Sequence, residues 1–494
     1  MKNIFLLLGL LLLSSCSNSF LEIYPETSLN EGNFYKSEKE YILLANGCYI
    51  PMRNYYKESG WIIGEIRSDN TSFMYNPNDG GQIDARQIEW FQCTANNTHY
   101  TSLWNFAYNG INRCNKLIEE LENSSIIWET EGIKERCYGE AYFFRAFYYF
   151  ELVRNFGGVP LITSVINSQE AVSVERVSEM EIYNQVIKDL EASVLNFETS
   201  VNVEEPGRAN YASALSLLGR VYLTMHEYDK TISVLEKVIS LKKYTLLPEY
   251  KDLFNPAAKD FKETIFAVQY SENNQDMANQ FCFRFAPWTS KGEITMRPNI
   301  NISGSRYGWN QPTSDLILAF EEGDKRKEAS IGTWHGKDWD GVERDLMYCC
   351  KFKPPVSAPD DRCSDNLPII RYSDVLLMMA EALNEKGETS RALSFVEKVR
   401  NRAGLSTPTN ITKESLSILI AKERQVEFCF ENQRWYDLKR TGKALDVMRT
   451  HGIKEKQMKP YIDQSTYILE EYMLLAPIPA DEIAISALKQ NPGY

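Results

Sequence analysis

Residues 137–156 are apolar or aromatic on nearly every side, which narrows the folds that this chain can adopt. The aromatic side chains of this stretch are Tyr138, Tyr142, Phe143, Phe144, Phe147, Tyr148, Tyr149 and Phe150. A helix that is apolar all round has to be enclosed by other elements, so the stretch predicts a helix at the centre of a large core. Gly157, Gly158 and Pro160 follow directly and predict the end of that helix.

Two later segments share one spacing of apolar and small residues. The first contains Leu215, Leu218, Gly219, Tyr222, Thr231, Leu235 and Val238, and the second contains Leu376, Met379, Ala380, Leu383, Ala392, Val396 and Val399. This is the spacing of the antiparallel helix pair in a tetratricopeptide repeat. Because the segments lie 161 residues apart, they predict two separate pairs and no tandem array. The predicted fold class is mostly α, a helical scaffold with tetratricopeptide-like pairs and long loop and strand inserts.

The inserts are predicted to be surface loops that carry aromatic residues, apart from a strand at 263–270. Segments 273–311 and 331–368 are rich in Gly, Pro, Asn, Ser and Asp. Four of the nine tryptophans lie in these two segments, namely Trp288, Trp309, Trp334 and Trp339. Loops of this length in a compact domain are usually functional when they are ordered.

The N-terminal residues are predicted to form a targeting segment. Lys2 precedes an apolar run at 4–13, which is too short to cross a bilayer as a helix and is typical of a secretory signal. Leu13-Ser14-Ser15-Cys16 then resembles the bacterial lipoprotein box, in which the cysteine is acylated and becomes the mature N-terminus. We therefore predict a signal peptide at 1–15, a lipidated Cys16 with a tether at 16–32, and attachment to the membrane through lipid alone.

The composition and the motifs exclude several functions. With 67 acidic and 54 basic residues the formal net charge is −13, which is unsuited to a nucleic-acid partner. The ten cysteines include no C-x-x-C pair and the four histidines are scattered, so no metal site and no cofactor are predicted. Cys349, Cys350 and Cys363 are interpreted as incidental thiols or as one local bridge. No nucleophile elbow, P-loop, dinucleotide fingerprint or zinc-protease motif is present, and no catalytic residue is predicted.

One acidic stripe has two interpretations. Glu423, Glu427 and Glu431, with Arg424 and Arg434, fall largely on one face of a helix. Paired carboxylates suit glycoside hydrolysis, whereas acids and arginines at this spacing also form ion pairs. The sequence shows no apolar surroundings that would raise the pKa of one carboxyl, so we favour a structural ion-pair network and predict that the protein is not an enzyme.

Several blocks spread over the chain carry a family resemblance. They are Phe20-Leu21-Glu22, residues 64–70, residues 141–160, residues 372–405, residues 423–442 and the C-terminal Gln490-Asn491-Pro492-Gly493-Tyr494. Together they resemble the RagB/SusD family of surface nutrient-binding lipoproteins. The resemblance implies a SusD-like N-terminal helical region at 33–225 and a C-terminal region with ligand-binding inserts at 226–494. It also implies a lipid-anchored protein of the cell outer membrane that faces the exterior, binds an oligosaccharide and delivers it to a SusC-like TonB-dependent transporter.

Two alternatives belong to other classes. Tetratricopeptide-like pairs also suit a scaffold that binds peptides or other nutrients, and the acidic stripe leaves a surface glycoside hydrolase as the less favoured choice.

The candidate ligand residues are aromatics with polar neighbours, because sugar rings pack on Trp and Tyr while polar groups bind their hydroxyls. The candidates are Asp69, Asn70, Arg86, Trp90, Tyr307 and Trp309. Gly308 and Pro312 favour a turn that presents the indole of Trp309 outward. Trp309, with Trp90 as a second platform, is therefore predicted to stack on the ligand.

Overall fold

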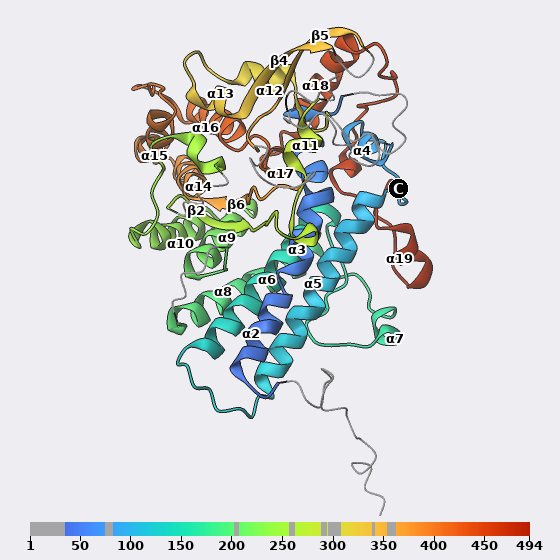
Figure 1. Cartoon of the computed structure of the whole chain (residues 1–494), viewed down its shortest axis with the longest axis vertical. Helices are drawn as coiled ribbons and strands as arrows, with labels where there is room; N and C mark the ends of the chain where they lie inside the picture. Colours follow the sequence, from blue (N-terminus) through green and yellow to red (C-terminus); the bar gives the residue numbers. More distant parts are fainter. Residues whose placement is uncertain are drawn as a thin grey trace, which may run out of the picture.

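The computed structural model describes residues 35–74, 83–201, 207–255, 262–287, 294, 308–337, 341–352 and 362–494. These residues form the mostly helical scaffold that the sequence predicts. In Figure 1 the long N-terminal helices occupy one end of the molecule, and the β4–β5 hairpin lies at the opposite end. The predicted signal peptide, Cys16 and the tether lie outside the described residues.

The N-terminal half is built around one enclosed helix, α6 (Ile133–Phe156). The elements near it in the chain are α2 (Glu38–Gly47), α3 (Ile50–Tyr55), the π-helical η2 (Tyr56–Gly60) and η3 (Ile62–Ile66), α4 (Ile83–Glu89), α5 (Thr98–Glu122), α7 (Ser168–Ala171) and α8 (Glu179–Thr199). Helices α5 and α8 both pack against α6. A Cβ on Gly110 of α5 would lie 2.1 Å from the ring of Tyr148, so glycine permits the close approach of α5 and α6. Gly157 ends α6 with a φ of 71°, as the sequence predicts.

The two predicted helix pairs are confirmed. The first consists of α9 (Tyr211–Thr224) and α10 (Tyr228–Ser240), and the second of α14 (Tyr372–Glu385) and α15 (Thr389–Arg402). Gly219 allows the first pair to close, because a Cβ there would lie 2.5 Å from Leu235 Cδ2. Helix α10 packs against α14, so the two pairs lie side by side although 161 residues separate them in the chain.

Short strands connect distant parts of the chain. The predicted strand at 263–270 is confirmed as β2 (Thr264–Val268), which pairs antiparallel with β6 (Leu367–Arg371). Strand β1 (Thr71–Ser72) pairs with β3 (Gln311–Pro312). The prediction of continuous loops at 273–311 and 331–368 is wrong in two places: α11 (Phe281–Phe285) lies in the first, and β4 (Ile331–Lys337) forms a hairpin with β5 (Glu343–Cys349) in the second. In β4, intermediate and exposed residues alternate, which is the pattern of a strand with one face partly covered.

A second, smaller core surrounds the C-terminal helices. The remaining elements are η5 (Tyr250–Phe254), η6 (Gln275–Met277), α12 (Ser314–Ala319), α13 (Lys325–Ser330), α16 (Lys413–Glu427), α17 (Arg434–Arg440), α18 (Ala444–Met458), η7 (Glu471–Leu474) and α19 (Ala480–Ile485). Trp435 and Leu438 of α17 are buried in this core. Of the helices in the described ranges, none combines the length and the hydropathy that a bilayer crossing requires.

Two thiols meet where α11 faces the segment before β6. Cys282 Sγ and Cys363 Sγ are 2.9 Å apart, and both side chains are buried. The structure therefore places Cys363 against Cys282, which lies far from it in the sequence.

We expect Cys282 and Cys363 to form a disulfide when the folded chain meets an oxidised thiol–disulfide reagent such as glutathione disulfide, which takes up the two electrons. The chain is then denatured, alkylated without reduction and digested, and the masses of its peptides are measured by mass spectrometry. The expected product is one cross-linked peptide pair, which disappears in Cys282→Ser. Alkylation of both thiols in the oxidised wild type would contradict the expectation.

Candidate functional site

Asp69 and Asn70, predicted as ligand contacts, are buried and engaged inside the protein. Asp69 accepts two hydrogen bonds from Arg434 of α17, from Nε at 2.7 Å and from Nη2 at 2.9 Å. Asn70 donates to Glu65 Oε1 at 2.9 Å. The prediction that these two side chains face a ligand is wrong in this structure. Asp69 is held by Arg434 of α17, and Asn70 also accepts from Gln425 Nε2 of α16 at 3.0 Å, so both join the segment after η3 to the C-terminal helices.

Glu65 is the centre of that connection. Its carboxylate accepts the backbone N–H groups of Phe430 and Asn432 at 2.8 and 2.9 Å. Gly64 beside it is required, since a Cβ there would lie 2.8 Å from the carbonyl oxygen of Asn432. The segment 64–70 that carries part of the family resemblance is therefore a structural clamp between η3 and the loop after α16.

Trp309 is buried as well, with 3% of its surface exposed. Its ring centroid lies 5.4 Å from that of Trp61, edge to face, and Trp61 also contacts Phe285. Gly308 does adopt a φ of 70°, yet the backbone N–H of Trp309 then donates to the carbonyl of Arg284 at 3.0 Å and holds this segment against α11. The prediction that this turn presents the indole outward is wrong, because the turn docks on α11.

Arg86 and Trp90 are half-buried at the end of α4, and the Arg86 guanidinium lies 5.9 Å from the Trp90 ring centroid. Trp90 packs at the edge of both hydrophobic cores and retains an exposed part. Its role as a ligand platform stays a prediction. Tyr307 lies outside the described residues.

The β4–β5 hairpin offers an aromatic face that sequence reasoning placed in a loop. Trp334 pairs with Leu346, and Tyr348 pairs with Gly332 on the same face. The two rings lie against glycines: a Cβ on Gly336 would meet the Trp334 ring at 2.4 Å, and one on Gly332 would meet the Tyr348 ring at 2.5 Å. Both aromatics are half-exposed. The alternating Gly–Trp–Gly pattern at 332, 334 and 336 was the available signal for this strand.

The acidic stripe forms the predicted ion-pair network. Glu427 Oε1 accepts from Arg371 Nη1 at 2.8 Å and from Arg402 Nη2 at 2.5 Å, and Glu427 Oε2 accepts from Arg326 Nη1 at 3.2 Å. Burial alone would raise the pKa of Glu427, but these three guanidinium groups hold that pKa well below its usual range. A general acid of a glycosidase needs the opposite shift, so this carboxylate is suited to a structural role.

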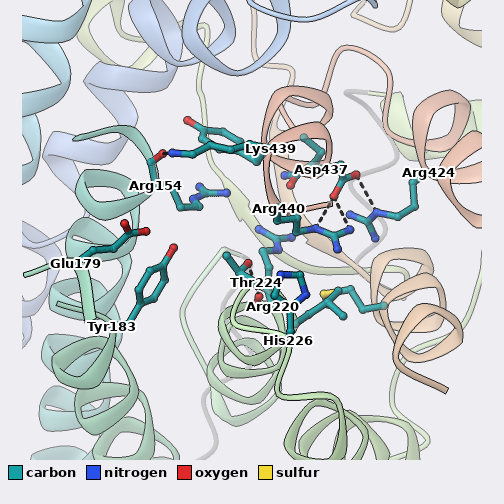
Figure 2. A pocket seen from close by; sticks show the side chains of 14 residues that line it. Arg154, Glu179, Tyr183, Arg220, Thr224, His226, Arg424, Asp437, Lys439 and Arg440 are labelled. Carbon is teal, nitrogen blue, oxygen red and sulfur yellow. Dashed lines mark hydrogen bonds and ion pairs between the residues drawn. The ribbon is translucent and has the colours of Figure 1, made fainter. Parts of the chain in front are cut away.

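A charged pocket of about 220 Å³ lies between α6, α8, α9, α16 and α17 (Figure 2). Its arginines are neutralised by acids: Asp437 accepts from Arg424 and from Arg440, each at 2.8 Å, and Arg220 pairs with Asp374 at 2.5 Å. Lys439 donates to the carbonyl of Arg154 at 2.5 Å. The pocket has charged groups of both signs. Within the described ranges, no group of His, Cys, Asp and Glu could hold a metal ion.

A buried acid next to Trp90 gives a pH-dependent prediction. Glu89 is 3% exposed and accepts from the Tyr467 hydroxyl at 3.1 Å. Burial raises the pKa of Glu89 to about 8, although Lys459 opposes the shift. The folded state thus keeps a proton that the unfolded chain releases near its ordinary pKa of 4.5, and stability contributed by the neutral acid is lost as the pH rises through 8.

Glu89→Gln should therefore flatten the fall of melting temperature between pH 5 and pH 9, since glutamine is neutral throughout. Thermal melts of both proteins across this range measure the effect. Glu470→Gln, a change at an exposed glutamate, serves as the control and should leave the profile unchanged. Parallel profiles of wild type and Glu89→Gln would mean that Glu89 is ionised in the folded protein.

The fold and the aromatic face of the hairpin define the class of protein: a helical scaffold in which tetratricopeptide-like helix pairs support inserts that carry half-exposed aromatic residues. Two family models match the chain, one described as starch-binding associating with outer membrane over residues 20–223 and one described as SusD family over residues 343–494. Together they account for more than half of the chain. The chain belongs to the SusD/RagB family.

Individual relatives agree with this assignment. A SusD-like protein of Formosa agariphila is 27% identical, with 90% of this chain and 91% of the relative covered. A solved laminarin-binding SusD-like protein is 27% identical with a TM-score of 0.77, and 93% of this chain and 100% of that one are covered. A surface glycan-binding protein from Bacteroides fluxus shares the fold at 23% identity, with a TM-score of 0.75, 93% of this chain and 100% of that one covered.

Proposed function

We propose that this protein is a non-enzymatic binding protein of the outer membrane, which captures an oligosaccharide and delivers it to a SusC-like TonB-dependent transporter. The observation that carries the proposal is the similarity, along the full length of the relative, to a laminarin-binding SusD-like protein. The description of the family model over residues 20–223 supports the outer-membrane location. The neutralised acidic stripe supports binding without hydrolysis. The division of the body into regions 33–225 and 226–494 is part of the same proposal.

The ligand platform that we propose is the aromatic face of the hairpin, Trp334 and Tyr348, with Trp90 as a further contact. Half-exposed rings that lie against glycines offer the apolar surface that the C–H face of a sugar ring requires. The opposite face of the hairpin carries exposed polar residues such as Thr333, which provides a matched control.

The test is a glycan and peptide array on the whole mature chain, followed by calorimetry on the strongest ligand. Trp334→Ala should weaken oligosaccharide binding by about tenfold, equivalent to about 1.4 kcal/mol, while Thr333→Ala leaves it unchanged. An array that selects peptides and no glycan would favour the peptide-binding alternative. Shortening of the bound oligosaccharide by the pure protein would favour a hydrolase.

The anchor in this proposal is Cys16, which lies outside the described residues. Cells fed a fatty-acid analogue should label the wild-type protein in the membrane fraction and should not label Cys16→Ala. Surface protease treatment of intact cells tests whether the body faces the exterior. A Cys16→Ala protein that is still labelled and membrane-bound would exclude this cysteine as the anchor.

A further inference from the structure

Arg67, at the end of η3, is a buried arginine without a carboxylate partner. It is 2% exposed, its Nη2 donates to the carbonyl of Met473 at 2.5 Å, and its Nη1 is buried without a hydrogen-bond partner. Within the part of the chain that the structure describes, Arg67 forms no ion pair. A charged donor that is buried and unsatisfied costs free energy.

Aromatic rings surround the charge but do not satisfy Nη1. The Arg67 guanidinium carbon lies 4.3 Å from the ring centroid of Trp435, 5.6 Å from that of Tyr100 and 5.7 Å from that of Phe91. Cation–π contacts stabilise the positive charge. They provide no negative charge, so the positive charge of Arg67 has no acidic partner among the described residues.

The neighbouring buried arginines differ from Arg67 because each of them pairs with an acid. Arg424 and Arg440 share Asp437, and Arg434 is held by Asp69 at 2.7 Å, so each buried guanidinium of this region has an acid of its own chain. Arg67 has none. The unpaired charge of Arg67 also acts on Lys439. Burial, together with repulsion by Arg67 and Arg154, lowers the pKa of Lys439 to about 7. The positive charge of Arg67 is therefore not paired with an acid of the described residues.

Arg67 borders a cleft of about 280 Å³, which we call the Arg67 cleft. The rings of Tyr472 and Tyr494 line it and meet edge to face with centroids 5.1 Å apart. Gln92 and Ser465 also line it and are hydrogen-bonded to each other at 3.1 Å, which places an amide and a hydroxyl at the cleft. The volume is just below the range of about 300–1,000 Å³ that holds drug-sized ligands, and it suits a single sugar ring.

We propose that the Arg67 cleft binds a carboxylated sugar unit of the captured glycan, and that the unpaired positive charge of Arg67 in the cleft wall attracts the carboxylate. Tyr472 and Tyr494 contact the ring, and Gln92 and Ser465 bind its hydroxyls. The proposal rests on the proposed glycan-binding function and narrows it to acidic glycans. A local cation is needed because the chain carries a net charge of −13 and repels acidic ligands at long range.

The experiment is calorimetry on the whole mature chain with three probes: glucuronate, glucose and acetate. We expect glucuronate to bind at least about tenfold more tightly than glucose, and acetate to compete with glucuronate. In Arg67→Met the preference for glucuronate over glucose should disappear. Equal affinities for the two sugars in the wild type would overturn the proposal.

A second pair of variants keeps the test decisive if Arg67→Met does not fold. Glu470 and Glu471 are adjacent exposed glutamates at the start of η7, and of the two Glu470 is the one that lines the cleft. Glu470→Gln should tighten glucuronate by about two- to fivefold and leave glucose unchanged, because it removes a like charge from the rim. Glu471→Gln changes the net charge equally and should leave both affinities unchanged. Equal effects of the two variants would overturn the assignment to the cleft.

The outcomes also separate this proposal from the proposed function. If oligosaccharides bind but glucuronate shows no preference that depends on Arg67 or Glu470, the cleft proposal fails and glycan capture stands. If no sugar binds while acetate binds and is lost in Arg67→Met, the anion site stands and glycan capture fails.

Discussion

Replacing Trp309 with alanine should lower the free energy of unfolding by about 3–5 kcal/mol and leave the ligand affinity of the folded fraction unchanged. The side chain is 3% exposed and packs on Trp61, so truncation leaves a cavity between η3 and α11. Urea unfolding followed by circular dichroism measures the stability, and calorimetry on the same sample measures binding.

Two controls give this result its meaning. Trp309→Phe should cost much less stability, because the indole N–H of Trp309 makes no hydrogen bond to the described residues and the ring contact with Trp61 is largely kept. Trp334→Ala should show the reverse pattern, a small loss of stability with weaker oligosaccharide binding. If Trp309→Ala keeps its stability and loses affinity instead, the indole contacts the ligand and its burial is relieved on binding.

The helical scaffold was predictable because its signals are local. The all-round apolar α6, the stop at Gly157 and the spacing within α9–α10 and α14–α15 each follow from periodicity over a few turns. The side-by-side packing of α10 and α14 was not predictable, because no local pattern reports which of several apolar faces meet.

The candidate site was predicted less well, because its burial depends on contacts between distant parts of the sequence. Asp69 is buried by Arg434, and Trp309 is buried by Trp61, which are partners hundreds of residues away in sequence. A polar or aromatic residue in a Gly-rich segment looks the same whether it faces solvent or docks on a distant helix. Arg67 was overlooked because its distinguishing property, the lack of an acid partner, exists only in three dimensions.

Removing the charge of Glu427 should cost about 3–5 kcal/mol of stability, the range found when one partner of a buried ion pair is deleted. Glu427→Gln leaves the buried guanidinium groups of Arg371, Arg402 and Arg326 facing a neutral amide in the interior. Glu388→Gln is the matched control: Glu388 pairs with Arg391 at 3.1 Å on the surface, and exposed pairs contribute about 0–1 kcal/mol.

The pH dependence of the stability tests the same ion pairs of Glu427 independently. Because the folded-state pKa of Glu427 is depressed below its ordinary 4.5, its contribution is present above that value and is lost as the pH falls through the folded pKa. The stability gap between wild type and Glu427→Gln, measured by urea unfolding, should therefore be full at pH 7 and shrink below pH 4. One outcome would contradict the structural role: the wild type hydrolyses a bound oligosaccharide, and Glu427→Gln keeps its stability and its fold but no longer does so. That result would assign a catalytic role to the acidic stripe, although three guanidinium groups keep the Glu427 carboxyl ionised and therefore unable to donate a proton.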